Sequence, residues 1–542
     1  MHPNLAQVAP SDSILGKRAI DLDHDWQEYG TSLPQCLDAR SFLQRTRREE
    51  GDVADKLPTV DVDTLNEEQR TCFDFVLHHH DRRRQGVDIP PLRLIVQGAA
   101  GTGKSYVIGA IEQTLNLVDD LSDVFPTCML LAPTGVAAAG IGGRTIHSAL
   151  QLPLKLQNLK DLKGKAAESF QNRWSRVSYI VVDERSMVGC NLFAAMDVRL
   201  RQAKPHASGQ SFGGISVILI GDPFQLPPVC DPVLFAPSSN TSTVLVQTGR
   251  LLYREFTQAL VLSIPQRQTG IDDESVWFRQ FLHRVKYGQV QADDHNRLMT
   301  RQLDRLSAEV RLTFGSALRV LSTNDTVDSY NQKFLMHMGG PVARIEAIHK
   351  GTGAANVGYD DAGGLDKVIY VAAGCRVMLN WNAWTTKGLV NGAVGTVQGI
   401  VYEGDSRPPA LPVAVIVQFD DYRGPSCLPD VERCVPICPL KRTWTSPSDE
   451  SCSRTQIPLS LAHAVTVFKA QGSTLSKASV DIGRREYAAG LGFVAFSRVK
   501  KFSDLALENF VEANRILNLG KSQSNQLRIA EEVRLKGLGL QY

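Results

Sequence analysis

Residues 98–105 read Gly98-Ala99-Ala100-Gly101-Thr102-Gly103-Lys104-Ser105, a complete G-x4-G-K-S phosphate-binding loop. An apolar run at 92–96 leads into this loop, and apolar residues follow it at helical spacing from 107 to 115. The loop is therefore predicted to join a β-strand to a helix N-terminus, where backbone N–H groups converge on phosphate oxygens. We expect Lys104 to reach the β- and γ-phosphates of ATP and the Ser105 hydroxyl to bind Mg²⁺.

Around this loop and beyond it, the chain has the sequence pattern of an α/β protein. Short β-branched runs at 92–96, 128–132, 179–182 and 217–220 alternate with helix-patterned stretches, which is typical of parallel βαβ units. We predict one α/β unit that extends to about residue 250 and a second that begins near residue 251, with a helix over 275–285 and a strand over 318–322. The segment 346–454 is rich in Gly, Val and Pro, which predicts a small β-barrel inserted in the second unit.

Composition and charge exclude several classes of protein. The 542 residues amount to about three to four domain lengths, and 43% hydrophobic residues with 21% charged residues are ordinary globular usage. The net charge of +2 means that any polyanion must be held by a local basic track. The chain has no apolar run of about 18 residues and no secretory signal pattern, so we expect no membrane contact and an intracellular location, the nucleus rather than the mitochondrion.

The cysteine pattern favours reduced thiols. Ten cysteines are spread along the chain without a paired framework. The four nearest one another, Cys427, Cys434, Cys438 and Cys452, lack the short paired spacing of common zinc modules. Bound zinc is the less favoured of the two interpretations.

An acidic pair ends the third apolar run, in Tyr179-Ile-Val-Val-Asp183-Glu184. Asp183 is expected to hold the water shell of Mg²⁺, and Glu184 to orient or deprotonate the water that attacks the γ-phosphate. The fourth run ends in Gly221-Asp-Pro-Phe-Gln225, where Gln225 would donate a hydrogen bond to the γ-phosphate. Without the phosphate loop, these stretches would be a solvated strand end and an ordinary Gly-Asp turn.

Two arginines are candidates for the positive charge that the transition state of phosphoryl transfer requires. Arg267 lies in Leu262-Ser-Ile-Pro-Gln-Arg267 and opens the second α/β unit, and Arg498 ends Phe493-Val-Ala-Phe-Ser-Arg498 near its close. If both units face one nucleotide, these side chains arrive from across the cleft as arginine fingers. Taken singly, each has the alternative interpretation of a surface arginine.

Taken in order, these motifs resemble the petite-integration-frequency (PIF) family of DNA helicases, a branch of helicase superfamily 1B, over roughly residues 60–512. Leu65-Asn-Glu-Glu-Gln69 is similar to the Q motif, which implies that Gln69 reads adenine. Lys469-Ala-Gln471-Gly472 resembles motif V, which implies nucleotide contacts for Gln471 and Gly472, and Arg498 falls at the motif VI arginine. Met196-Asp-Val-Arg199 and Phe212-Gly213-Gly214 are similar to the stretch that sets this family apart.

The resemblance also supplies candidate contacts to a DNA strand. Thr134-Gly135 and Thr145-Ile-His147 resemble the motif Ia region, which touches single-stranded DNA. Lys469 and the tryptophans Trp381 and Trp384 complete the candidate set, since aromatic side chains can stack on bases. An equally good interpretation of the two tryptophans is a place in the β-barrel core.

The domain organisation that the resemblance implies is two RecA-like parallel-sheet domains with an SH3-like barrel inserted in the second. Its boundaries are a flexible tail over 1–57, domain 1A with a small wedge insertion over 58–250, domain 2A over 251–345 and 455–515, domain 2B over 346–454, and a C-terminal helix or tail over 516–542. Within the last segment, Leu527, Ile529, Ala530, Val533 and Leu535 are predicted to form the apolar side of a short helix.

The function implied is a DNA helicase that hydrolyses ATP-Mg, moves 5′ to 3′ on single-stranded DNA and unwinds forked DNA in repair, recombination or telomere maintenance. A monomer is expected, with a dimer on DNA as the alternative. Four positions depart from the family pattern: Arg185, His463, Phe468 and Leu491. They motivate the alternative function, a coupling-impaired remnant of a mobile-element helicase that only binds single strands.

Overall fold

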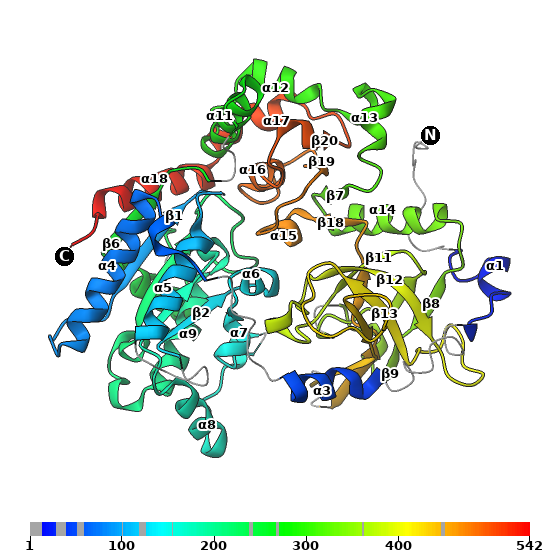
Figure 1. The fold of residues 1–542 in the computed structure, drawn as a ribbon, viewed down its shortest axis with the longest axis horizontal. Helices are drawn as coiled ribbons and strands as arrows, with labels where there is room; N and C mark the ends of the chain where they lie inside the picture. Colours follow the sequence, from blue (N-terminus) through cyan, green and yellow to red (C-terminus); the bar gives the residue numbers. More distant parts are fainter. Residues whose placement is uncertain are drawn as a thin grey trace. The chain divides into compact units, whose positions relative to one another are not determined.

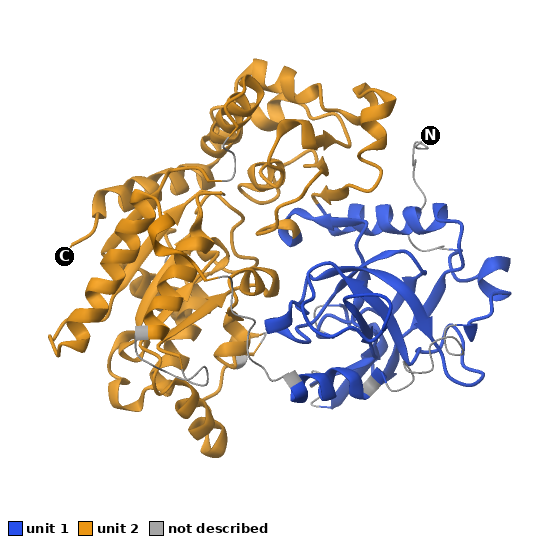
Figure 2. Cartoon of the chain, viewed as in Figure 1, with its two compact units in different colours: residues 1–54, 323–469 blue, residues 55–322, 470–542 orange. Residues whose placement is uncertain are grey.

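The computed structural model describes residues 14–28, 39–50, 59–99, 101–118, 126–153, 155–237, 242–266, 270–359, 362–445 and 450–541. Two compact units are found: unit 1 contains residues 1–54 and 323–469, and unit 2 contains residues 55–322 and 470–542 (Figure 2). Within these described ranges, no helix has both the length and the apolar character needed to cross a membrane.

Unit 2 contains a six-stranded parallel sheet that carries the phosphate loop (Figure 1). Its strand order is β3-β2-β4-β5-β1-β6, and every pair is parallel. The strands are β1 (Arg93–Gly98), β2 (Cys128–Ala132), β3 (Arg144–Thr145), β4 (Tyr179–Val182), β5 (Ser216–Gly221) and β6 (Gln258–Leu262). Because β6 pairs with β1, the first α/β region runs past the boundary predicted at 250/251, and that boundary was wrong.

Successive residues of these strands enter two different cores, which explains their unbroken apolar runs. Leu94 and Val96 pack in one cluster with α4 (Glu67–Arg84), α5 (Lys104–Val118) and α6 (Gly135–Gly140). Ile95 and the alternate residues of β2, β4 and β5 pack in the other cluster. The helices of that second cluster are α7 (Ile146–Ala149), α8 (Gly164–Trp174), α9 (Cys190–Ala203), α10 (Val244–Arg254) and α18 (Gln523–Leu538). The sheet is therefore covered on both faces, and the predicted parallel α/β architecture is confirmed.

The family-specific stretch around residues 196–214 builds a tight turn against α9. Phe212 and Gly213 both have positive φ, 56° and 60°. The Asp197 carboxylate accepts the Phe212 N–H at 2.5 Å and the Arg201 guanidinium at 2.7 Å. A Cβ on Gly213 would lie 2.5 Å from the Leu200 carbonyl oxygen, so only glycine fits this position.

We expect Gly213→Ala to destabilise unit 2 by about 2 kcal/mol, because the substitution combines a left-handed backbone with a backbone clash. A lowered thermal midpoint in calorimetry would measure the effect. Gly209→Ala is the matched control, since a Cβ at Gly209 meets nothing within 4 Å. Equal midpoints for the two variants would contradict the assigned role of the turn.

The rest of unit 2 is a second α/β region. Strands β7 (Leu318–Leu321), β19 (Ala478–Asp481) and β20 (Leu505–Leu507) are parallel, with β19 between the other two. Its helices are α11 (Asp273–Tyr287), α12 (Ala292–Met299), α13 (Ala308–Leu312), α16 (Leu491–Phe496) and α17 (Ala513–Leu517). The helix and the strand predicted over 275–285 and 318–322 are confirmed in α11 and β7.

Unit 1 is mainly antiparallel β-structure, in sheets ordered β14-β13-β12-β11-β17, β15-β16-β9 and β10-β8. The strands are β8 (Ala343–Glu346), β9 (Ile348–Lys350), β10 (Val368–Val371), β11 (Arg376–Leu379), β12 (Val394–Val401), β13 (Ala414–Phe419), β14 (Cys434–Ile437), β15 (Leu440–Thr445), β16 (Ser451–Gln456), β17 (Leu459–Leu461) and β18 (Ala464–Thr466). The helices are α1 (Ala19–Leu22), α3 (Ala39–Glu50), α14 (Asn324–His337) and α15 (Val467–Ala470), whose last residue lies in unit 2.

The N-terminal segment differs from the flexible tail predicted over 1–57. Leu15 is fully buried and Trp26 is 6% exposed, both in the core of unit 1. The Asp21 carboxylate accepts the Val342 N–H at 2.8 Å, which fastens the segment to β-structure far along the chain. Residues 1–13, 29–38 and 51–57 of that prediction lie outside the described residues. The hydrophobic pattern did not reveal this packed segment, because it is anchored by single apolar residues and has no repeating apolar spacing.

The C-terminal helix α18 buries a different face from the one predicted. Val533 is 65% exposed and Ala530 is exposed, whereas Arg528, Glu531, Glu532 and Leu535 are buried. The predicted apolar side was therefore wrong at Ala530 and Val533, whereas Leu527 and Ile529 are half-buried and Leu535 is buried. The charged face is buried because each of its side chains finds a hydrogen-bonding partner in unit 2.

Candidate nucleotide site and nucleic-acid contacts

The phosphate loop lies between β1 and the first residue of α5, as predicted. Gly101 and Gly103 have φ values of 84° and 77°, in a left-handed region that residues other than glycine rarely adopt. The Lys104 ammonium donates to the carbonyl oxygens of Gly98 and Ala99, at 2.9 Å each. The lysine thus points back over its own loop, where it can exchange these carbonyls for phosphate oxygens. Ala100 lies outside the described residues.

Gln69 is packed against the phosphate loop. It is 3% exposed, and its side-chain amide donates to the Thr102 carbonyl at 3.2 Å. The same amide accepts the Asn66 N–H at 3.1 Å, which completes a capping box at the start of α4. A Cβ on Gly103 would lie 2.3 Å from the Gln69 amide nitrogen. Gln69 therefore joins α4 to the loop, and adenine reading by this residue stays a prediction.

The acidic pair follows β4, where the sequence predicted it. Asp183 is 6% exposed and its carboxylate accepts the Glu184 N–H at 2.8 Å. Burial and the neighbouring Glu184 raise the pKa of Asp183, and Lys104 opposes this rise. Glu184 has φ 49° and ψ 45°, a left-handed conformation that is uncommon for glutamate and often found at functional sites.

Motif V residues contact this pair directly. The Gln471 side-chain amide donates to the Glu184 carboxylate at 3.0 Å, and both side chains are buried. A Cβ on Gly472 would lie 3.8 Å from the other Glu184 carboxylate oxygen. Glu184 ends a strand of the first sheet, and Gln471 lies just before β19 of the second α/β region. The structure therefore brings residues from both regions together around one carboxylate.

Gln225 lies in the loop after β5 and is 3% exposed. Its buried amide oxygen has no hydrogen-bonding partner among the described residues. The loop is fixed by Asp222, whose carboxylate accepts the Phe224 N–H at 3.1 Å and lies 3.4 Å from the Lys286 ammonium. This oxygen can only accept a hydrogen bond, so donation from the Gln225 amide nitrogen to the γ-phosphate stays a prediction.

The Arg498 side chain is buried, with 2% of its surface exposed. Its guanidinium donates to the carbonyls of Val494 at 2.7 Å and Ser473 at 3.1 Å and to the Ser497 hydroxyl at 2.8 Å. A role as an arginine finger requires Arg498 to exchange some of these bonds for phosphate. Ser473 directly follows Gly472, so this contact places Arg498 beside the segment that contains Gln471 and Gly472.

Arg267 lies outside the described residues, but its neighbour does not. The Gln266 N–H donates to the Gly101 carbonyl at 2.6 Å, so the segment after β6 rests on the phosphate loop. Strand β6 belongs to the first sheet and α11 to the second α/β region, so the prediction that Arg267 opens the second unit stays a prediction.

The residues proposed for ATP-Mg fit that ligand chemically. Ser105 is exposed at the start of α5, and Asp183 supplies a carboxylate at the end of β4. Hydroxyl and carboxylate oxygens are the hard ligands that Mg²⁺ prefers, and Mg²⁺ keeps several waters beside them. The lysine on the loop and the helix N-terminus complement the phosphate charge.

The motif Ia residues gather at the ends of two neighbouring strands. Ala132 of β2 pairs with Thr145 of β3, so Thr134 and His147 follow adjacent strand ends. The Thr134 hydroxyl caps α6 and the Thr145 hydroxyl caps α7, with acceptor distances of 3.3 Å each. Gly135 is buried, and His147 is half-buried, which lowers its pKa. These side chains form one group, although their hydroxyls already serve the local helices.

The two tryptophans differ in exposure. Trp384 is 1% exposed in the core of unit 1, so its selection as a strand contact was wrong, and the alternative interpretation as core is confirmed. Trp381 is half-buried beside the same core, and Lys469 is exposed on α15. Both keep enough free surface to contact a nucleic acid.

Two departures from the family pattern lie in unit 1. The His463 ring accepts the Arg376 N–H at 3.0 Å and stacks on Phe334 with ring centroids 3.7 Å apart. Phe468 is half-buried on α15. His463 is therefore held by a hydrogen bond to its ring nitrogen and by stacking of its ring on Phe334.

The two departures in unit 2 are buried. Leu491 is 1% exposed at the first position of α16. Arg185 donates to the Tyr253 hydroxyl at 2.9 Å, and this hydroxyl donates to the Glu531 carboxylate at 2.5 Å. Arg185 thus has a buried polar environment that includes α18.

Sequence reasoning missed the contribution of α18 to this site. Gln97, directly before the phosphate loop, donates to the Glu532 carboxylate at 2.7 Å. Arg528 donates to the Phe224 and Gln225 carbonyls at 3.1 and 2.9 Å. One signal was available, because Gln97 is a polar residue at the end of an otherwise apolar strand.

Residues 64–296 match the model of the PIF1-like helicase family. The ATP-dependent DNA helicase PIF1 of Homo sapiens is 28% identical over 422 residues, which cover 76% of this chain and 58% of that protein. The Mus musculus protein of the same name is 30% identical, and the match covers 76% of this chain and 57% of that protein. The ATP-dependent DNA helicase RRM3 of Saccharomyces cerevisiae is 26% identical, with 76% and 62% covered. The chain thus spans less than two thirds of these relatives.

Solved structures share the fold. Bacteroides Pif1 bound to single-stranded DNA has a TM-score of 0.62 at 20% identity, covering 88% of this chain and 99% of that one. Pif1 from Candida albicans has a TM-score of 0.60 at 24% identity, covering 85% and 99%. A structure of two coordinating Pif1 helicases on forked double-stranded DNA has a TM-score of 0.62 at 22% identity, covering 88% and 100%.

Proposed function

We propose that this chain is a PIF1-like helicase, an ATP-dependent DNA helicase that moves 5′ to 3′ on single-stranded DNA, because residues 64–296 match the model of that family and curated helicases are similar to the chain. Its substrates are single-stranded and forked DNA, and its cellular role lies in DNA repair, recombination or telomere maintenance, inside the cell and in the nucleus. The hydrogen bond from Gln471 to Glu184 carries the proposal. It supports an ATP site built from both α/β regions of unit 2, which a nucleotide-driven motor needs.

The two α/β regions act as RecA-like domains 1A and 2A, and the antiparallel sheets of unit 1 contain the SH3-like domain 2B. The sheet order β14-β13-β12-β11-β17 supports an inserted barrel-like module. ATP must bind the two conformations of the protein with different affinities, because equal affinities would not shift the equilibrium between them.

Nucleotide binding is assigned to the phosphate loop. Lys104 leaves the carbonyls of Gly98 and Ala99 for the β- and γ-phosphates, while Ser105 and Asp183 hold Mg²⁺. Bound Mg²⁺ neutralises charge on the phosphates. Burial raises the pKa of Asp183, and Mg²⁺ held there would require this side chain in its ionised form.

Hydrolysis is assigned to Glu184, Gln225 and the arginines. Glu184 orients the attacking water and accepts its proton, with Gln471 holding the carboxylate in place. Gln225 senses the γ-phosphate through its side-chain amide. Arg498, together with Arg267, supplies positive charge to the transition state.

Strand contacts are assigned to the group Thr134, Gly135, Thr145 and His147, with Lys469 and Trp381 as further contacts. Phosphate contacts and base stacking supply the grip, the stacking being worth about 1 to 3 kcal/mol per base. The protein acts as a monomer, with two copies on one fork as the alternative. A binding-only remnant is not favoured, because none of the four departures replaces a residue assigned to ATP.

The test is displacement of a labelled strand from a duplex with a 5′ single-stranded tail. We expect displacement with ATP, none on the matching 3′-tailed duplex, and none with Lys104→Ala. Lys165→Ala, at an exposed lysine of α8, is the matched control and should behave as the unmodified protein. Displacement that survives Lys104→Ala, or that requires a 3′ tail, would contradict the proposal. ATP turnover that DNA does not stimulate would favour the binding-only remnant.

A further inference from the structure

The buried face of α18 is made of charged residues that reach the ATP-site loops. Arg528, Glu531 and Glu532 are 3%, 4% and 5% exposed and stand on one side of the helix at spacings of three and four residues. Charged side chains are seldom buried this completely unless each is paired, because removing charge from water is costly. Their partners therefore indicate what the helix does.

Arg528 connects the loop after β5 with the segment before α16. Its guanidinium donates to the Phe224 carbonyl at 3.1 Å, the Gln225 carbonyl at 2.9 Å and the Ala489 carbonyl at 2.9 Å. The first two belong to the γ-phosphate-sensing loop proposed above. The third stands two residues before α16, whose C-terminal end leads to Arg498.

Gly490 provides independent evidence for this junction. It has φ 84°, and a Cβ on it would lie 2.2 Å from the Phe224 carbonyl oxygen and 2.7 Å from the Arg528 guanidinium. The backbone before α16 therefore touches the loop after β5 where Arg528 fastens both. Any larger residue at 490 would push the two segments apart.

The neighbouring carboxylates reach the other two strand ends of the site. Glu532 accepts the Gln97 amide at 2.7 Å, directly before the phosphate loop, and the Tyr287 hydroxyl at 2.8 Å. Glu531 accepts the Tyr253 hydroxyl, which in turn accepts from Arg185 beside Glu184. One helix thus touches the ends of β1, β4 and β5, either directly or through Tyr253.

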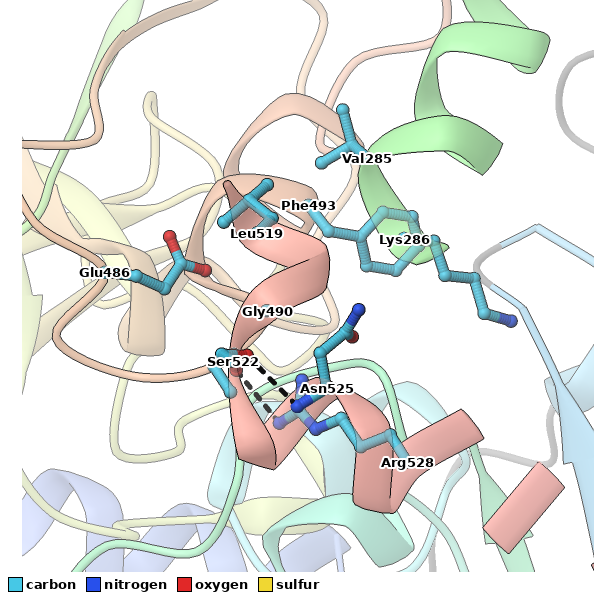
Figure 3. A pocket seen from close by; sticks show the side chains of 10 residues that line it. Val285, Lys286, Glu486, Gly490, Phe493, Leu519, Ser522, Asn525 and Arg528 are labelled. Carbon is cyan, nitrogen blue, oxygen red and sulfur yellow. Dashed lines mark hydrogen bonds between the residues drawn. The ribbon is translucent and has the colours of Figure 1, made fainter. Parts of the chain in front are cut away.

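The space beside Arg528 leaves no room for a small-molecule ligand. Lys286, Glu486, Phe493 and Asn525 line a cavity next to it, with Arg528 and Asn525 contributed by α18 (Figure 3). The cavity has room for about one water molecule. Arg528 therefore binds backbone carbonyls of the protein and is not placed to bind a small-molecule ligand.

From these contacts we infer that α18 is a positioning element for the ATP site, and that Arg528 sets the Gln225 loop against the segment that carries Arg498. The inference rests on the proposed function and assigns that site a further residue. Arg528 touches neither nucleotide nor DNA. It acts through the backbone of Phe224, Gln225 and Ala489, so that γ-phosphate sensing and finger placement change together.

The test compares Arg528→Met, Arg528→Lys and Gly490→Ala in the full chain. Methionine removes all three donated bonds, so we expect kcat for ATP hydrolysis to fall about tenfold or more while the Kd for ATP changes less than about threefold. Lysine keeps the charge but not the planar fork, and should give an intermediate kcat. Gly490→Ala should reproduce the effect of Arg528→Met.

Arg254→Met, at an exposed arginine of α10, is the matched control and should leave kcat unchanged. Rates are expressed per ATP-binding molecule, so loss of folded protein alone cannot lower them. An Arg528→Met protein with kcat equal to that of the unmodified protein overturns the inference. If that variant yields no folded protein, a folded Arg528→Lys protein with unchanged kcat overturns it equally.

Hydrogen–deuterium exchange separates this inference from the proposed function. In nucleotide-free protein, Arg528→Met should speed exchange in the segments 222–228 and 486–490, and Arg254→Met should not. If the unmodified protein hydrolyses no ATP, the proposed function fails, while the exchange result still decides the inference. Unchanged exchange in both segments would overturn it.

Discussion

Replacing Glu184 with glutamine should lower kcat for ATP hydrolysis by about 10² to 10⁴, the range typical of a lost general base, while ATP still binds. Glutamine has the shape of glutamate but cannot accept the proton of the attacking water. The side chain is buried, and its partner Gln471 can also donate to a glutamine oxygen, so the local structure should persist. The prediction is therefore a specific loss of chemistry.

Single-turnover hydrolysis together with an ATP-binding titration measures this effect. Glu309→Gln, at an exposed carboxylate in the first turn of α13, is the matched control and should retain full turnover. Gln471→Ala should give a smaller loss, because it frees the Glu184 carboxylate without removing it. If Glu184→Gln turned over ATP at the rate of its control, another residue would have to be the base.

Replacing Arg498 with alanine should lower kcat by about 10³ or more, within the range known for arginine fingers, with ATP binding nearly intact. The reason is that a finger stabilises charge that develops only in the transition state. In the structure its guanidinium donates hydrogen bonds to the carbonyls of Val494 and Ser473. These bonds keep a buried charge satisfied until a phosphate can replace some of them.

A purely structural arginine would give a different pattern. Loss of its bonds to Val494 and Ser473 would lower the thermal midpoint and the folded fraction, but kcat per ATP-binding molecule would stay the same. Arg498→Lys separates the two roles further, since an ammonium keeps the charge but cannot donate in the planar geometry of guanidinium. Equal loss of ATP binding and of turnover in Arg498→Ala would argue against the finger.

The nucleotide site could be predicted from sequence because its parts are local. The phosphate loop and the Asp183–Glu184 pair each occupy one short stretch after an apolar strand, and parallel strands align such ends at one edge of a sheet. The strands alternate with helices at the expected positions, which made the α/β class evident. The contact of Gln471 with Glu184 also agrees with the implied motif order.

Other features depend on which distant groups meet, and no local pattern reports that. Trp384 has the same residue type as Trp381, yet only tertiary packing puts it in the core of unit 1. Strand β6 lies beyond the predicted boundary at residue 250 because β1 offers it an open sheet edge. Leu15 and Trp26 are ordered by a core that forms more than 300 residues later in the chain.

By itself, the sequence determined the phosphate loop, its acidic partners and the α/β class, because each follows from residue types at short fixed spacing. The tertiary structure alone decided the role of α18, whose charged residues looked like the solvent side of an amphipathic helix. Arg528 is buried because three backbone carbonyls converge on it, and those carbonyls belong to segments that only the folded chain brings together. Local spacing can indicate chemistry, whereas the burial of a charge depends on partners supplied by the fold.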